Sequence, residues 1–279
     1  MNKSWTTMLL VSLGVLACTF AAFYWLTSEH CSKCYKLERE NFIYIVHGDL
    51  TETLVADIDN NLQNHRRQLL EDFKLDDMPK VVVRIWDGET TFLTEQEKAI
   101  GKQFPGSLGY VLPRKGKARG ELGLLQKNPN IADTALHEFV HLITLEINPK
   151  FSNNPHYLWE AIAIYKSENS WKYAQRPDMI RNRFDVLAQS LFTNGDTGAV
   201  YELGYTIGQY IEETWGKEAF IALIKSNGNF AGLTNKPVEE IFQSWKQFVK
   251  ATYFSGSQAG KPNNALLQPI FPTHTAPPK

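Results

Sequence analysis

The feature that most constrains the fold is a pair of histidines, one helical turn apart, inside a strongly apolar segment. The sequence His-Glu-Phe-Val-His occupies positions 137–141, between an expected N-cap at Asn130 and a helix-ending Pro149. The apolar residues of this segment recur with the helical period and form a broad stripe. Because residues four apart share one face of a helix, both imidazoles can bind one ion while Glu138 projects beside it. The segment therefore predicts a buried helix that carries a metal site.

This combination of side chains is typical of metal-dependent hydrolases. His137 and His141 would hold a zinc ion, and Glu138 would accept a proton from the water that attacks a carbonyl carbon. The alternative is a pair of hydrogen-bonded histidines in an ordinary core. Burying two histidines and a glutamate without strong partners costs free energy, however, and a metal ion is such a partner. We therefore expect one zinc ion per chain.

A catalytic zinc site needs a third protein ligand. Glu146 is excluded because, nine residues after His137 at about 100° per residue, it points to the opposite side of the same helix. His156 lies closer to the motif than Glu160, but it has no helical neighbour of catalytic type. We expect His156 to be a surface residue or one that supports the ligands.

Glu160 is the best candidate for the third ligand. Asn154 and Pro155 are a favourable N-cap and first-turn pair, so a second helix should run from His156 to about Lys166. After a short reversal, this helix would run antiparallel to the first and could aim one carboxylate at the metal. The alternative is an ordinary exposed glutamate on a helix.

At this point the chain resembles the gluzincin metallopeptidases. In that family the two-histidine helix is followed, after eighteen intervening residues, by a liganding glutamate, and positions 142–159 are such an interval. The string from Trp159 to Tyr165 is also similar to the Trp-Glu-x-x-Ala-x-Tyr element of the thermolysin-like and aminopeptidase-like branches. The resemblance extends over about residues 133–220 and implies that Glu160 is the third zinc ligand.

A second element of this resemblance lies further along the chain. Tyr201, with the following Glu-Leu-Gly, resembles the Tyr-Glu-x-Gly element of the zinc aminopeptidases, whose tyrosine hydroxyl stabilises the oxyanion. The resemblance implies this role for Tyr201, and a neutral phenol can donate the required hydrogen bond. Tyr205, one turn further, is the competitor, and both tyrosines could instead be packed aromatics.

The chain departs from the aminopeptidases before the metal helix. Their Gly-x-Met-Glu-Asn strand, whose glutamate binds the free amine of the substrate, has no counterpart here. Positions 106–113 and 121–125 instead predict short strands around a basic turn. This departure argues against an exopeptidase, although an edge strand could still pair with an extended peptide.

The amino-terminal segment predicts a membrane attachment. Residues 8–26 are nineteen positions without a charge, long enough to cross a bilayer. We expect a retained single-pass anchor with the catalytic domain outside the cytoplasm, and a cleaved signal peptide or a lipid on Cys18 as alternatives. Cys31 and Cys34 could form a local disulfide or remain thiols.

Composition and pattern divide the rest of the chain. The net charge is −1 with scattered lysines and arginines, so there is no nucleic-acid footprint. We expect an anchor and linker over residues 1–34, a peptidase domain over 35–255 and a disordered Pro-rich tail over 256–279. The sequence gives no indication of the oligomeric state.

The expected fold class is α+β, with a sheet-bearing part over residues 35–130, a helical part over 131–255 and the zinc cleft between them. Strands are predicted at 42–46 and 81–86 and within 107–125. Beyond the metal helix and the Glu160 helix, the helices are predicted at 50–73, 94–101, 178–192, 201–215, 217–226 and 237–253.

The favoured function is a membrane-tethered zinc endopeptidase, a hydrolase that acts on peptides or proteins. His137, His141 and Glu160 would hold the zinc, Glu138 would be the general base and Tyr201 would stabilise the oxyanion. The alternative is a non-catalytic module that keeps the peptidase fold for binding or assembly at the membrane.

Overall fold

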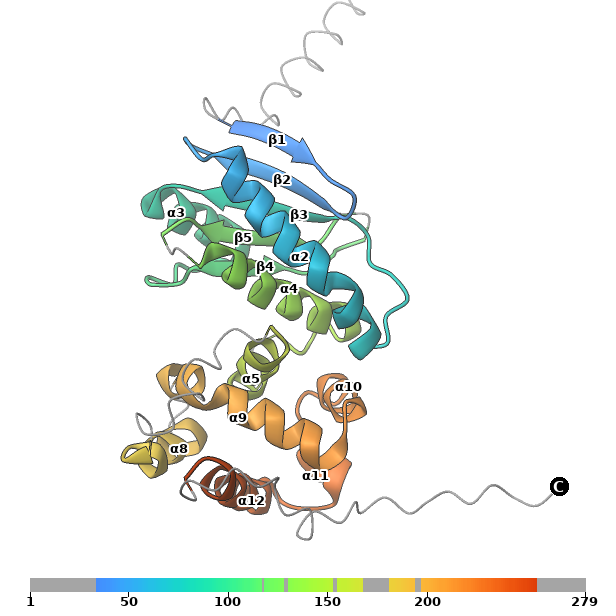
Figure 1. Ribbon diagram of the computed structural model, residues 1–279, viewed down its shortest axis with the longest axis vertical. Coiled ribbons are helices and arrows are strands. Elements are labelled where there is room, and N and C mark those ends of the chain that lie inside the picture. Colours follow the sequence, from blue (N-terminus) through green and yellow to red (C-terminus); the bar gives the residue numbers. More distant parts are fainter. Residues whose placement is uncertain are drawn as a thin grey trace, which may run out of the picture.

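The computed structural model describes residues 34–116, 118–127, 130–152, 155–167, 181–193 and 197–254. Within them the fold is α+β, with one five-stranded sheet followed by helices (Figure 1). The predicted anchor over 8–26, the tail over 256–279, Cys18 and Cys31 lie outside these residues. Cys34 is disulfide-bonded. No helix in the described ranges is long and apolar enough to cross a membrane.

The sheet has parallel strands at its centre and an antiparallel strand at each edge. Its strand order is β1-β2-β3-β5-β4. The pairs β2·β3 and β3·β5 are parallel, whereas β1·β2 and β4·β5 are antiparallel. The strands are β1 (Cys34–Glu38), β2 (Phe42–His47), β3 (Val81–Trp86), β4 (Gly109–Leu112) and β5 (Glu121–Leu125).

Helices cover both faces of the sheet. The α2 helix (Glu52–Asp72) and the α4 helix (Ile131–Ile147) pack on the main core, where Phe42 of β2 meets Phe139 of α4 edge to face. The α3 helix (Glu89–Ile100) belongs to a separate small cluster that contains Trp86 and Phe92. Alternating strand residues therefore supply two cores, as expected for a sheet buried on both faces.

The described chain after residue 130 contains helices and no strand, in agreement with the predicted helical part. Figure 1 shows these helices below the sheet, with α5 next to α4 and α9 beyond α5. They are α5 (His156–Lys166), α8 (Phe184–Thr193), α9 (Thr197–Trp215), α10 (Glu218–Lys225), α11 (Phe230–Thr234) and α12 (Val238–Val249), and a π-helical turn follows α12 over Lys250–Phe254.

Several element boundaries differ from the sequence predictions. The α3 helix begins at Glu89 rather than at Thr94, because Phe92 in its first turn is fully buried. Neither β1 nor α11 is predicted: β1 is a partly exposed edge strand, and α11 is a single short turn capped by Asn229. The bounds of α5 agree with the prediction, but its N-cap is Pro155 rather than Asn154.

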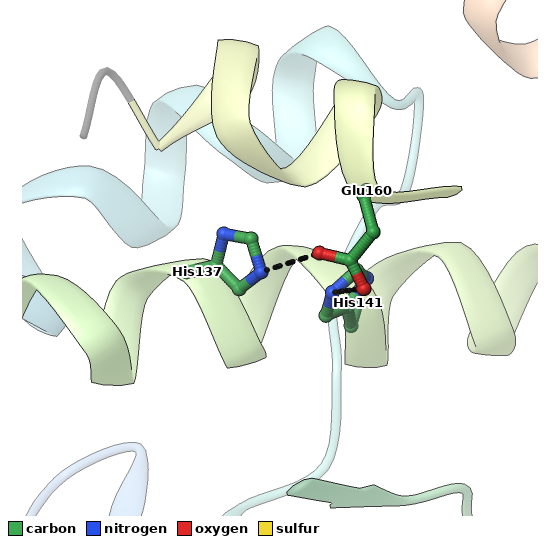
Figure 2. Close-up of side chains that lie close together, drawn as sticks. All are labelled: His137, His141 and Glu160. Atoms are coloured by element: carbon green, nitrogen blue, oxygen red, sulfur yellow. Dashed lines mark ion pairs between the residues drawn. The ribbon is translucent and has the colours of Figure 1, made fainter. Parts of the chain in front are cut away.

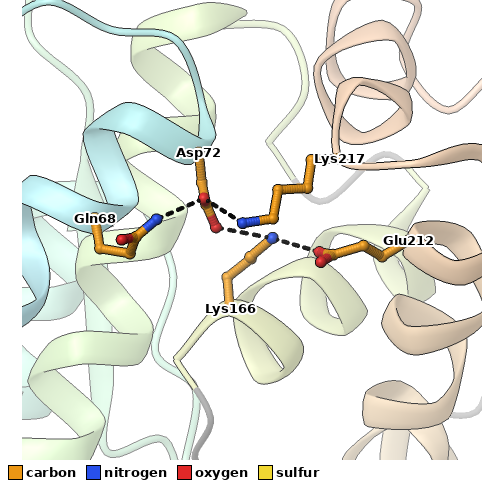
Figure 3. A network of polar contacts seen from close by, with 5 residues as sticks. All are labelled: Gln68, Asp72, Lys166, Glu212 and Lys217. Carbon is orange, nitrogen blue, oxygen red and sulfur yellow. Dashed lines mark hydrogen bonds and ion pairs between the residues drawn. The ribbon is translucent and has the colours of Figure 1, made fainter.

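The two halves of the fold are joined by a buried ion-pair network (Figure 3). Asp72, at the end of α2, accepts hydrogen bonds from Lys166 of α5 at 3.0 Å and from Lys217 at 2.9 Å. Lys166 also donates to Glu212 of α9 at 2.6 Å and is only 6% exposed. Because a buried lysine needs its counter-charges, these contacts fix α5 and α9 against α2.

The network makes stability depend on pH. Burial favours the neutral form of Asp72, but the hydrogen bonds from Lys217 and Lys166 outweigh it and hold its pKa below the usual range. A carboxylate with a depressed folded-state pKa stabilises the fold above its unfolded pKa of about 3.9, and this stability is lost as the pH falls through the folded pKa.

We therefore expect Asp72→Asn to lower the free energy of unfolding at pH 7 by about 1–3 kcal/mol, because it removes a charge that faces two lysines. The difference from wild type should shrink as the pH falls through the depressed pKa of folded Asp72, because wild-type Asp72 is then protonated too. Urea denaturation at pH 7 and at a series of lower pH values measures it. Asp77→Asn is the control, since the Asp77 side chain is 79% exposed and pairs only at the surface with Arg66. An equal loss in both variants would contradict a special role for the network.

Candidate metal centre

Three of the predicted site residues converge between α4 and α5 (Figure 2). His137 Nε2 lies 3.3 Å from Glu160 Oε2, and His141 Nε2 lies 3.6 Å from Glu160 Oε1. The two histidine rings are nearly perpendicular, with centroids 4.6 Å apart. The histidines come from successive turns of α4 and the carboxylate comes from the facing helix, so one short interval of chain assembles the group.

The geometry of this group suits a metal ion. One nitrogen or oxygen atom from each of the three side chains lies within 4.8 Å of the others, so the group could hold a metal ion. Two ligand atoms that each lie about 2.0–2.1 Å from one tetrahedral ion are roughly 3.4 Å apart. The observed separations of 3.3 and 3.6 Å are close to this value. Within the described part of the chain, buried Glu160 Oε2 has no hydrogen-bond partner.

The charges of the group stabilise one another against burial. Burial alone would raise the pKa of Glu160, but His141 and His137 lower it well below its usual range, so the carboxylate is ionised. Burial lowers the pKa of His141 to about 4 and leaves its imidazole neutral. Burial would also lower the pKa of His137, but Glu160 raises it overall. An anionic carboxylate beside a neutral imidazole is a suitable ligand set for a cation.

Glu138 lies on a different side of α4 from the histidines. A side chain placed on Gly109 of β4 would come within 2.5 Å of Glu138 Oε1, so the carboxylate packs directly against this strand. Burial raises the pKa of Glu138 to about 7, His137 lowers it and Glu160 raises it further. One residue advances a helix by about 100°, which explains why Glu138 faces the sheet edge while its neighbour faces α5.

The structure brings Tyr201 of α9 to the same region. The residue as a whole is 48% exposed, whereas its hydroxyl end is largely buried. Burial of the hydroxyl and then the negative charges of Glu160 and Glu138 raise its pKa, and a hydrogen bond with Glu160 contributes. The phenol is therefore neutral and lies beside both carboxylates.

Two glycines of α9 explain how Tyr201 reaches the site. A Cβ on Gly208 would lie 2.3 Å from Tyr165 Cβ, and one on Gly204 would lie 3.3 Å from Ala161 Cα. Small residues four apart let the backbones of α5 and α9 approach closely. Gly204 of the Tyr-Glu-x-Gly element thus packs against α5, one turn after Tyr201.

The other candidate residues lie apart from the group. Tyr205 packs edge to face on Tyr165, with ring centroids 5.2 Å apart. Glu146 pairs with Arg114 at 2.6 Å, away from the histidines. His156 begins α5, and its charge contributes to lowering the pKa of His141. His156 therefore influences a member of the group.

Sequence reasoning missed two residues that shape the site. Gly109 leaves the space that Glu138 fills, and Trp159 stacks on His141 with ring centroids 3.7 Å apart. The position of Trp159 next to Glu160 was the available signal, since side chains about 100° apart on a helix can both border the interface with a facing helix. The sequence around Gly109 did not indicate its role, because its contact with Glu138 joins a strand to a helix and depends on how the two pack.

No protein-family model matches the chain, and comparison with curated proteins finds no match either. The function is therefore inferred from the residues of the site and their geometry.

Purified full-length protein should contain about one zinc ion per chain, and Glu160→Ala or His141→Ala should lose most of it, because each removes one of three ligands. Elemental analysis after dialysis measures this. Bound zinc should also raise the melting temperature in the wild type alone, since a ligand specific for the native state stabilises it. Glu146→Ala is the control for removal of a carboxylate from α4. Full zinc content in Glu160→Ala would exclude Glu160 as a ligand.

Proposed function

We propose that this protein is a zinc-dependent endopeptidase of the gluzincin type, with the site between its sheet-bearing and helical halves. The observation that carries the proposal is the meeting of His137, His141 and Glu160, with the carboxylate of Glu138 alongside. A ligand group alone would suit a structural metal. Hydrolysis also requires a general base, and the buried carboxylate of Glu138, which is not one of the three ligands, is a candidate for it.

Zinc is the metal that this set of ligands favours. Two imidazole nitrogens and one carboxylate are a common three-residue set for catalytic zinc, which keeps a further position open for water or substrate. When bound, zinc would supply Lewis-acid polarisation of a peptide carbonyl and would acidify a water molecule. Glu160 and the two histidines would hold the ion.

Glu138 is the proposed general base. A base works best when its pKa is close to the working pH, and burial raises the pKa of Glu138 to about 7. Its carboxylate would accept the proton of the attacking water and then return it to the leaving nitrogen of the cleaved bond. The packing of Glu138 against Gly109 holds the carboxylate next to β4.

The edge strand β4 supports a peptide as the substrate. Gly109 lies opposite Leu124 and Val111 opposite Leu122, and Leu125 N donates to Leu108 O at 2.9 Å. In this antiparallel register the main-chain groups of Gly109 and Val111 point away from β5. An extended peptide could pair with them by strand addition, which would lay its backbone beside Glu138.

Tyr201 is the proposed oxyanion donor. Its neutral hydroxyl lies near Glu138 and Glu160, where negative charge would develop on the attacked carbonyl oxygen. A hydrogen bond to this charge lowers the barrier more than it strengthens substrate binding. We also propose that the uncharged segment over residues 8–26 tethers the enzyme to a membrane, with the site outside the cytoplasm.

Glu138→Gln tests the proposal most directly. The variant keeps size and hydrogen bonding but cannot accept the proton, so hydrolysis of an unfolded protein substrate should fall by roughly 10²–10⁴. Its zinc content should equal that of the wild type. If the wild-type protein binds zinc and peptides but hydrolyses none, the alternative of a non-catalytic binding module is correct.

Tyr201→Phe should lower kcat by roughly 10²–10³ with little change in KM, because the lost hydrogen bond forms mainly in the transition state. Steady-state kinetics on a quenched peptide would measure both constants. Tyr205→Phe removes a hydroxyl from the same helix one turn away and should have little effect. A loss confined to Tyr205→Phe would show that the roles are reversed.

A further inference from the structure

Trp159 makes two contacts with the part of α4 that carries His141. Its ring lies over the His141 imidazole with centroids 3.7 Å apart and planes inclined by 29°. Its indole N–H donates a hydrogen bond of 3.0 Å to Thr144 Oγ1. The Thr144 hydroxyl in turn donates to the carbonyl oxygen of His141 at 2.7 Å. Trp159 therefore contacts the ring of His141 directly and its backbone through Thr144.

His141 lacks the support that a ligand histidine ordinarily has. Most metal-binding histidines donate a hydrogen bond from their second ring nitrogen to a carboxylate or carbonyl, and this bond fixes the orientation of the ring. His141 Nδ1 is buried and has no hydrogen-bond partner among the residues that the structure describes. The rotation of the ring must therefore be restricted by packing. The stacked face of Trp159 supplies that restriction.

Trp159 also couples the two helices that carry the ligands. It precedes Glu160 on α5, and its hydrogen bond ends on fully buried Thr144 of α4. A shift of α5 along α4 would therefore break this hydrogen bond as it moved the Glu160 carboxylate. The same contact thus controls the orientation of one ligand and the distance to another.

We propose that Trp159 and Thr144 form a clamp that holds His141 in the orientation needed to bind the metal. Trp159 is thus a positioning residue rather than a ligand. The inference rests on the metal site of the proposed function, but it does not depend on peptide hydrolysis.

The helical half contains a second arrangement of the same kind, which provides a matched control. Trp245 of α12 donates from its indole N–H to Thr206 Oγ1 at 3.1 Å, and Thr206 donates to the carbonyl oxygen of Leu203 at 2.7 Å. Both side chains are buried, as is Thr144. Thr206→Val therefore removes an equivalent buried hydrogen bond, but one that does not involve a ligand.

The experiment titrates metal-free full-length protein with Co²⁺ and records the visible absorption bands and the dissociation constant. Trp159→Phe keeps an aromatic ring but loses the N–H donor, and Thr144→Val loses the acceptor at nearly constant shape. Each should weaken Co²⁺ binding by roughly 10-fold, as for other groups that orient metal ligands. At saturation each should give shifted bands, because the ligand geometry has changed. Thr206→Val should match the wild type in both measurements.

The double variant Trp159→Phe with Thr144→Val tests whether the two residues act as a unit. Both changes remove the same hydrogen bond. The dissociation constant of the double variant for Co²⁺ should therefore be within about twofold of that of the weaker-binding single variant. Thermal melts identify any variant that does not fold. If Trp159→Phe does not fold, the Co²⁺ titration of Thr144→Val alone tests the clamp.

Wild-type affinity and bands in the folded clamp variants would overturn the clamp while leaving the metal site intact. Equal weakening by Thr206→Val would also overturn it, because the effect would then be one of general stability. A wild-type protein that binds neither Co²⁺ nor Zn²⁺ would overturn both the clamp and the proposed function.

Discussion

The burial of α4 on both sides is the constraint on which the rest of the structure depends. The sheet and α2 cover part of the helix and α5 covers another part, so Glu138, His141 and Thr144 are largely removed from water. A carboxylate and two imidazoles are stable in such a place only if they face one another or a cation. His137, His141 and Glu160 satisfy this condition across the interface of α4 and α5. The same pairing sets the position of α5, and through α5 the position of α9.

The α4 helix presents the ligand histidines and the proposed base Glu138 on different faces. Its histidines face α5 and the metal group, whereas Glu138 faces Gly109 on the edge strand. A base held toward the sheet edge lies next to the main-chain groups with which a peptide could pair, and the adjacent face of the helix would hold the cation beside it. Residues beyond α4 tighten this arrangement. Glycines of α9 allow the backbones of α5 and α9 to approach closely. The ion pair between Asp72 and Lys166 fixes α5 to the sheet half.

The sequence predictions were correct where the structure of a segment depends on its own residues and less accurate where it depends on packing against other segments. The α4 helix, its two histidines and the second helix with Glu160 follow from helical periodicity and spacing, and the structure has them where predicted. The π-helical turn after Val249 and the early start of α3 were missed because packing decides where those helices begin and end. The edge strand β1 is short and only partly buried, and its pairing with β2 makes it a strand. The order of the strands likewise had no local signal.

By itself, the sequence determined the α+β class, the α4 helix and the residues that meet on it. These properties depend on the 3.6-residue period and on one short interval of chain, which any folded form must keep. Only the tertiary structure decided that Glu138 packs on Gly109, that Trp159 stacks on His141 and that Tyr201 rather than Tyr205 lies beside the carboxylates. Each of these contacts joins elements far apart in the chain or depends on how closely two backbones approach. Such distances are set by the packing of the whole core, which no local pattern encodes.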